Sequence, residues 1–214
     1  MATPKETFYE NQAATIIKKL NMRKMEGYYC KNVEEAKAKM LELIGNEKKT
    51  VGYGGSMTLD ENGFKDSVTA AGHELIIREN YKTPEEEKEL KSKLTNADFF
   101  LMSTNAITLD GELVNIDGRG NRVSYLIYGP DNVIVIAGMN KVVKTVEDAY
   151  NRARNFAAPA NKQRFENIQT PCETTGQCAN CVREDSICNQ FVLTRLSHPK
   201  NRIKVILVGE DLGL

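Results

Sequence analysis

The chain lacks an excess of charge of either sign. Its 29 lysine and arginine residues balance 29 aspartate and glutamate residues, so the formal net charge at pH 7 is +0. A strongly basic protein attracts nucleic acid and anionic lipid through its long-range field, and this chain has no such field. We therefore expect neither nucleic acid nor a membrane as a partner.

Long apolar runs are also missing. No stretch approaches the roughly 20 residues that a helix needs to cross a bilayer, and the first residues, MATPKETFYENQ, lack the apolar core of a secretory signal. These absences predict a cytoplasmic protein. A length of 214 residues with 41% hydrophobic side chains suffices for one core, and no repeat or interdomain linker divides it, so we expect a single domain over residues 1–214.

Familiar catalytic signatures are absent as well. Neither G-x-S-x-G nor H-E-x-x-H occurs, and the glycine-rich loops match neither the dinucleotide pattern G-x-G-x-x-G nor the P-loop. No nucleotide cofactor is therefore predicted. The two histidines, His73 and His198, have no recognisable serine or cysteine partner, and the sequence identifies no nucleophile.

Short apolar runs alternate with helical patterns, which is typical of an α/β fold with a mostly parallel sheet covered by helices. Capping residues predict helices that begin after Asn32, Thr83 and Thr145. The first of these should end at Gly45, and the last should end near Phe156, before Pro159. Strands are predicted at 28–30, 50–53, 73–78, 98–103, 132–138 and in the final run IKVILVGE.

Polar, glycine-rich loops follow three of these strands: GGSMT at 54–58, STNAIT at 103–108 and GMNK at 138–141. The passage NAITLDGELVNIDGRGNRV, residues 105–123, continues from the second loop and concentrates glycine, asparagine and acidic residues around a short apolar strand. Ligands bind at the carboxyl ends of parallel strands, where such loops gather. We therefore predict that the loops form the wall of one pocket.

The residue types in these loops favour a small anionic ligand. Glycine lets backbone N–H groups approach an anion, and arginine pairs with carboxylate or phosphate in bidentate fashion, although ordinary turns with solvated arginines are the alternative interpretation. Acid–base candidates are Asp117 and Glu112, the latter also compatible with a solvated turn. The predicted ligand-binding residues are Gly54, Gly55, Ser56, Thr58, Asn105, Asp110, Asp117, Gly118, Arg119, Gly120, Asn121, Arg122 and Asn140.

Four of the five cysteines lie together in CETTGQCANCVREDSIC, with the spacing C-x5-C-x2-C-x6-C. Four thiolates suit an iron–sulfur cluster or zinc. We favour an iron–sulfur cluster over structural zinc, and free thiols or a disulfide are the third interpretation. This predicts a metal-binding insertion at about 170–190 with the ligands Cys172, Cys178, Cys181 and Cys188, whereas Cys30 is expected to be a small buried residue.

The stretches VGYGGSMTL, NAITLDGELVNIDGRGNRV and VIVIAGMNKVVKTVEDAYNRARNFAAPAN resemble the lactate-utilisation (LUD) domain family, also described as LutC/YkgG-like. The resemblance covers most of residues 10–214. It implies a Rossmann-like three-layer sandwich similar to ribose-5-phosphate isomerase, NagB and CoA-transferases. Some members belong to operons that oxidise L-lactate to pyruvate and accompany iron–sulfur redox partner proteins. A homodimer is compatible with this superfamily.

In the sugar-phosphate isomerases of that superfamily, two glycine-rich loops hold the substrate phosphate, and the resemblance places this role on residues 54–58 and 118–121. Our leading hypothesis is an accessory redox enzyme or subunit that acts on a small carboxylate and has a four-cysteine metal site. One alternative is a non-redox enzyme that binds a sugar phosphate or CoA-like ligand, with structural zinc. The other is a binding module in which the cysteines sense redox state. Fold constrains function too loosely to choose among them.

Overall fold

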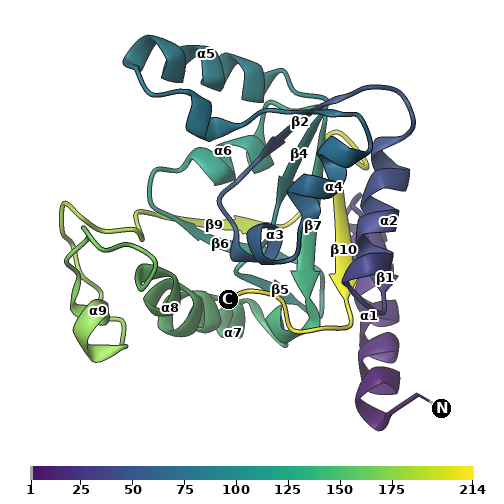
Figure 1. Cartoon of the computed structure of the whole chain (residues 1–214). Coiled ribbons are helices and arrows are strands. Elements are labelled where there is room, and N and C mark those ends of the chain that lie inside the picture. Colours follow the sequence, from purple (N-terminus) through teal and green to yellow (C-terminus); the bar gives the residue numbers. More distant parts are fainter. Residues whose placement is uncertain (1) are drawn as a thin grey trace.

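The structure, a computed structural model, describes residues 2–214. Its central element is a sheet of six parallel strands in the order β1-β10-β7-β4-β2-β3, with helices on both faces (Figure 1). This arrangement confirms the predicted α/β class with a parallel sheet. The strands are β1 (Glu26–Cys30), β2 (Thr50–Tyr53), β3 (Glu74–Leu75), β4 (Phe99–Met102), β7 (Asn132–Gly138) and β10 (Ile203–Val208).

The side chains of β7 show why helices cover both faces of this sheet. Val133 and Val135 belong to one hydrophobic cluster, whereas Ile134 and Ile136 belong to a second cluster on the opposite face. Successive side chains of a strand point to opposite faces, so a strand that is apolar at every position must be buried on both. The run NVIVIAG therefore requires a helical layer on each side.

The two helical layers are supplied by different parts of the chain. Helices α1 (Pro4–Met22), α5 (Pro84–Thr95) and α6 (Asn121–Ile127) contribute to the first cluster, and α2 (Val33–Ile44), α3 (Met57–Glu61) and α4 (Phe64–Ala70) contribute to the second. The result is a helix–sheet–helix sandwich. No helix of the described residues is long and apolar enough to cross a membrane.

A second, four-stranded sheet carries most of the passage 105–123. Its order is β8-β5-β6-β9, and β5 and β6 form an antiparallel pair. The strands are β5 (Ala106–Thr108), β6 (Leu113–Asp117), β8 (Val142–Val143) and β9 (Gln190–Thr194), and α7 (Val146–Arg152) packs against them. The chain leaves β6 at Asp117 and enters α6 at Asn121. The turn between them therefore connects the second sheet to a helix that packs on the first sheet.

The predicted helix starts are confirmed. Asn32 accepts a hydrogen bond from the Glu35 amide at 2.9 Å, and Thr83 and Thr145 each form a capping box with the acidic residue three positions later. Gly45 ends α2 as expected. The caps were predictable because they need only neighbouring residues.

Two predicted boundaries were wrong. The strand expected at 73–78 contains only Glu74 and Leu75, because β3 is the short edge strand of the sheet and the chain turns into a 3-10 turn at Arg78. The helix expected to stop before Pro159 continues to Lys162. A π-helical turn at Ala153–Ala157 ends two residues before the proline. Its wider hydrogen-bond pattern replaces the regular α-helical hydrogen bonds with which a proline ring would interfere.

The cysteine-rich segment lies between α8 (Ala158–Lys162) and β9. It begins with the short helix α9 (Pro171–Thr175), which Figure 1 shows at one end of the molecule next to α8. The fifth cysteine, Cys30, is buried in the core at the end of β1, where burial raises the pKa of its thiol to about 11.

Candidate functional site

A cavity of about 360 Å³ lies at the carboxyl ends of β2, β4 and β6. Gly55 follows β2, Ser103 follows β4, Gly118 follows β6, and all three line the cavity. The parallel strands β2 and β4 place their carboxyl ends at one edge of the first sheet, and β6 of the second sheet ends at the same place. Residues of α8 and the chain after it, including Asn161 and Arg164, close the other side.

Most of the residues predicted to bind a ligand line this cavity. Those that do are Gly55, Ser56, Thr58, Asn105, Asp117, Gly118, Arg119, Asn121 and Arg122. The loops at 54–58 and 117–122 therefore lie on the same side of the molecule. Among the described residues, the backbone amides of Gly55 and Ser56 donate to no other protein group, so both can donate to a ligand.

Gly54, Gly120 and Asn140 lie beside the cavity without lining it. The Gly54 amide donates to the Leu101 carbonyl at 2.9 Å, and the Gly120 amide donates to Asp117 Oδ1 at 2.9 Å. The side-chain oxygen of Asn140 accepts from the Leu212 amide at 3.1 Å. These residues position the chain around the cavity.

Asp110 and Glu112 lie elsewhere, in the hairpin between β5 and β6. Asp110 forms an exposed ion pair with Lys19 at 3.1 Å, and Glu112 accepts hydrogen bonds from Arg23 and Thr108. Asp110 thus connects the hairpin to α1. Glu112 bonds to Arg23, directly after α1, and to Thr108 within the hairpin. Neither is among the residues that line the cavity.

Arg122 is the largely buried centre of the cavity wall. Its Nη1 donates to the Ser103 carbonyl and to Asn115, and its Nη2 donates to Asn105 and to the Ile116 carbonyl, at 2.7–3.2 Å. The remaining group, Nε, lies 3.4 Å from Asp117 Oδ2. A guanidinium has five N–H donors, and here four are hydrogen-bonded while the fifth, on Nε, faces the Asp117 carboxylate in an ion pair. Arg122 therefore holds β4, β6 and the turn after β6 together, and has no donor left for a ligand.

Lys141 was not among the predicted residues, although it belongs to the loop GMNK. It ends the 3-10 turn that follows β7, lines the cavity and is only 3% exposed. Its Nζ donates to Thr58 Oγ1 and to Ser103 Oγ, each at 3.0 Å. Burial, with a smaller contribution from the positive charges of Arg152 and Arg122, lowers the pKa of Lys141 to about 7. The amine is therefore present in both protonation states near neutral pH.

Two further cations line the cavity without having been predicted. Arg78 was placed at the end of the strand predicted at 73–78, and in the structure it begins the 3-10 turn after β3 and lines the cavity. Arg164 follows α8, and nothing in the sequence near it indicated a site. It lies 3.5 Å from Asp60 in a partly exposed ion pair.

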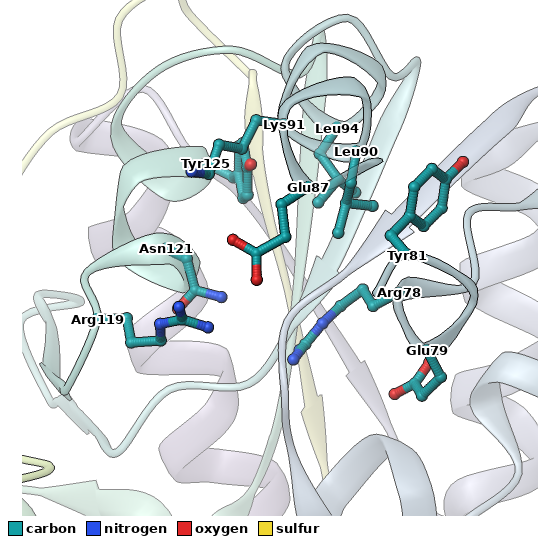
Figure 2. A pocket seen from close by; sticks show the side chains of 10 residues that line it. All are labelled: Arg78, Glu79, Tyr81, Glu87, Leu90, Lys91, Leu94, Arg119, Asn121 and Tyr125. Atoms are coloured by element: carbon teal, nitrogen blue, oxygen red, sulfur yellow. The ribbon is translucent and has the colours of Figure 1, made fainter. Parts of the chain in front are cut away.

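A second cavity, also about 360 Å³, adjoins the first. The two share Arg78, Arg119 and Asn121. Figure 2 shows Arg78 and Arg119 on opposite sides of the opening, with the Glu87 carboxylate between them and the leucines of α5 beyond it. This cavity is thus less basic than the one that contains Lys141, because Glu79 and Glu87 line it together with its cations.

The sequence pattern of the LUD domain matches residues 13–208. The chain belongs to the LUD domain family. This confirms the resemblance seen in the glycine-rich stretches, and most of the described fold falls within the matched range.

Solved structures support the fold of this LUD domain. A DUF162 family protein from Deinococcus radiodurans is 14% identical, with a TM-score of 0.55 over 94% of this chain and 98% of that chain. At this identity the likeness shows the fold alone. Ribose 5-phosphate isomerase from Plasmodium falciparum is 12% identical over 64% of this chain and 54% of that chain, and its TM-score of 0.27 is too low to carry an argument. No curated protein matches the chain.

The four clustered cysteines of this LUD domain are free thiols, each partly exposed. Cys178 Sγ accepts from Arg154 Nε at 3.3 Å and from the Asn180 amide at 3.5 Å. Cys188 is near enough to the other three that their negative charges, together with burial as the larger cause, raise its thiol pKa to about 11. They share one neighbourhood, yet across residues 2–214 no three His, Cys, Asp or Glu side chains are arranged to hold a metal ion. In this conformation the thiols do not fit a metal centre, and an iron–sulfur or zinc site stays a prediction.

Proposed function

We propose that this LUD domain binds a small carboxylate in the cavity that contains Lys141, and that Lys141 exchanges a proton with the bound molecule. The observation that carries the proposal is the charge of the cavity wall. Arg78, Arg119, Arg164 and Lys141 line it in addition to the buried Arg122. Asp117 is the one acidic side chain among the described lining residues, and it already accepts from Gly120 and pairs with Arg122.

Arg119 is the best placed of these cations to bind a carboxylate. It is exposed, it borders both cavities, and among the described residues it has no hydrogen-bond acceptor or acidic partner. A guanidinium without a partner can donate two parallel N–H bonds to a carboxylate. The free amides of Gly55 and Ser56 on the same wall add further donors. The cavity volume lies within the range of small-molecule sites.

Lys141 supplies the proton exchange. A group whose pKa lies near the working pH is the most effective general acid or base, because both of its forms are populated. With a pKa of about 7, Lys141 meets this condition, and its hydroxyl partners do not hold it as an ion pair. Asp117 and Glu112, the acid–base candidates of the sequence, both have cationic partners in the structure.

Calorimetric titration tests the binding. L-lactate and pyruvate should bind with heat, and lactamide, which lacks the negative charge, should not. Arg119→Gln should weaken binding about tenfold, because a hydrogen bond to a charged group contributes roughly 1.5–3 kcal/mol. Arg195→Gln is the matched control, since it removes an exposed arginine that does not line either cavity. Equal affinity for lactate and lactamide would contradict the proposal.

Binding of an organic phosphate is the second candidate function, and the adjoining cavity supports it. The two cavities meet at Arg78 and Arg119, so one ligand could place an anionic group between these arginines and a larger organic part beside α5. Ribose 5-phosphate and free phosphate in the same titration distinguish the candidates. Tighter binding of the sugar phosphate than of either carboxylate would favour this one.

A redox role for this LUD domain depends on the cysteine segment. Oxidation of a bound hydroxy acid needs an electron acceptor, and an iron–sulfur cluster at the four cysteines would supply one-electron transfer when bound. Because the thiols do not form a ligand set in this structure, the proposal contains no electron-transfer step. The accessory redox enzyme of the sequence-based hypothesis therefore rests on the metal analysis described in the Discussion.

A further inference from the structure

The geometry points to Lys141 as a nucleophile: we propose that its amine forms an imine with the carbonyl carbon of a 2-oxo acid held in the cavity. This inference rests on the proposed function, because the carboxylate of the 2-oxo acid is the group that the arginines of the cavity would bind. It adds a covalent step and a substrate class that carboxylate binding alone does not require.

The first support is the bonding of Lys141 Nζ. A lysine amine forms up to three hydrogen bonds, and here two positions are taken by Thr58 Oγ1 and Ser103 Oγ. Across residues 2–214 no carboxylate lies within ion-pair distance of this nitrogen. The third position carries a proton in the ammonium form and a lone pair in the neutral amine. Since Lys141 lines the cavity, that lone pair is available to a bound molecule.

The second support is the charge around the amine. Arg152 and Arg122 are the cations that act on Lys141, and Glu61 is the acid that partly opposes them. The nearest acid of the cavity wall, Asp117, is occupied by Arg122. A nucleophilic lysine must lose its proton, and desolvation next to other cations is a recognised way to achieve this. Burial in the cavity wall thus produces the neutral amine that imine formation needs.

Lys162 shows that burial alone does not create this condition. It is 1% exposed, yet its Nζ pairs with Glu173 at 3.3 Å and donates to the Phe165 carbonyl at 2.8 Å. An ion pair stabilises the charged form of an amine. Lys162 also does not line the cavity. The chain therefore contains one buried lysine with a carboxylate partner and one without, and Lys162 serves as an internal control.

The step balances without an oxidant. The Nζ lone pair forms a bond to the carbonyl carbon, and the C=O electron pair moves to oxygen, which takes up the proton that the nitrogen releases. Loss of this hydroxyl as water, together with the second amine proton, leaves a C=N bond between Lys141 and the acid. The hydroxyls of Thr58 and Ser103, each 3.0 Å from the nitrogen, can relay these protons. Amine and 2-oxo acid give imine and water.

Reductive trapping tests the proposal. The full chain is incubated with pyruvate and sodium cyanoborohydride, which reduces an imine to a stable secondary amine, and is then digested for peptide mass mapping. The expected product is one carboxyethyl group on Lys141, formed faster than on any exposed lysine. Lys162 should remain unmodified. L-lactate, which has no carbonyl group, should give no adduct under the same conditions.

Modification of Lys141 no faster than that of the exposed lysines would overturn the proposal. This comparison needs only the unaltered chain, so it remains decisive even if Lys141→Arg fails to fold. Where Lys141→Arg folds, it should lose the fast adduct, because a guanidinium does not form the imine. Pyruvate binding without an adduct would leave the proposed function intact and remove the imine, whereas absence of both would contradict the proposed function itself.

Discussion

Gly54 lies in direct contact with Arg122. A Cβ atom at Gly54 would be 2.7 Å from Arg122 Cγ, closer than real Cβ atoms come to a neighbour, and 3.0 Å from Cδ, which is also a tight contact. Gly54 belongs to the loop after β2, and Arg122 belongs to the helix that follows β6. The missing side chain therefore lets the two glycine-rich loops meet at one edge of the sheet.

Gly54→Ala should destabilise the protein by about 1–3 kcal/mol, the usual cost of overpacking a buried site. The Arg122 side chain cannot move aside cheaply, because all of its donors are bonded to the wall. Urea unfolding measures the change. Gly55→Ala is the matched control, since its nearest atom would be Arg78 Nη1 at 3.5 Å, an ordinary contact. Equal losses in the two variants would show that the contact with Arg122 is unimportant.

Arg122 and Arg119 should respond differently to the same substitution. Arg122→Gln removes a buried cation and leaves carbonyls and Asp117 without their partner, so we expect a loss of about 3 kcal/mol or more in unfolding free energy. Arg119→Gln alters an exposed residue and should stay within about 0.5 kcal/mol of the parent. Chemical denaturation of both variants checks this. A large stability loss for Arg119→Gln would mean that its role is structural.

Lys141 should make stability depend on pH. Below about pH 7 the lysine is charged in both folded and unfolded chains, so the folded state bears the full cost of the buried charge. Between about pH 7 and its ordinary pKa of 10.5, the unfolded chain holds a proton that the folded chain has released, so stability rises with pH.

Lys141→Met removes this dependence. Its stability gain over the parent should be about 3 kcal/mol larger at pH 6 than at pH 9, from roughly 1.4 kcal/mol for each pH unit above the lowered pKa. Urea unfolding of both proteins across this range gives the difference, in which other titrating groups cancel. A constant difference would show that the lysine keeps an ordinary pKa.

The cysteine segment should bind metal in protein kept free of oxygen. Anaerobic purification followed by iron, sulfide and zinc analysis, with visible and EPR spectra, tests the favoured iron–sulfur cluster. Cys178→Ser and Cys181→Ser should each release the metal, because both break the central C-x2-C chelate. Cys30→Ser should retain it, since Cys30 lies in the core at the end of β1. A protein that holds one zinc and no iron would contradict the electron-transfer hypothesis. A protein that holds no metal would support the interpretation of the four cysteines as free thiols or a disulfide.

The sequence by itself determined the class of fold and the approximate place of the site. Strands such as 132–138 are apolar at every position, and caps such as Thr83 with Glu86 use only neighbouring residues, so both are local properties of the chain. The loops that follow those strands had to gather at one sheet edge, because parallel strands all end there. That geometry accounts for the loops after β2 and β4, whereas residues 117–122 follow β6 of the second sheet and reach the same cavity through tertiary packing.

Only the tertiary structure decided which polar groups lack protein partners and can contact a ligand. Arg119 and Arg122 are three residues apart, yet Arg122 is surrounded by acceptors from β6 and the loop after β4 while Arg119 has none. Lys141 owes its lowered pKa to burial beside arginines from two other helices. Desolvation and hydrogen bonding depend on segments that are distant in sequence, and no local pattern records which of them will pack together.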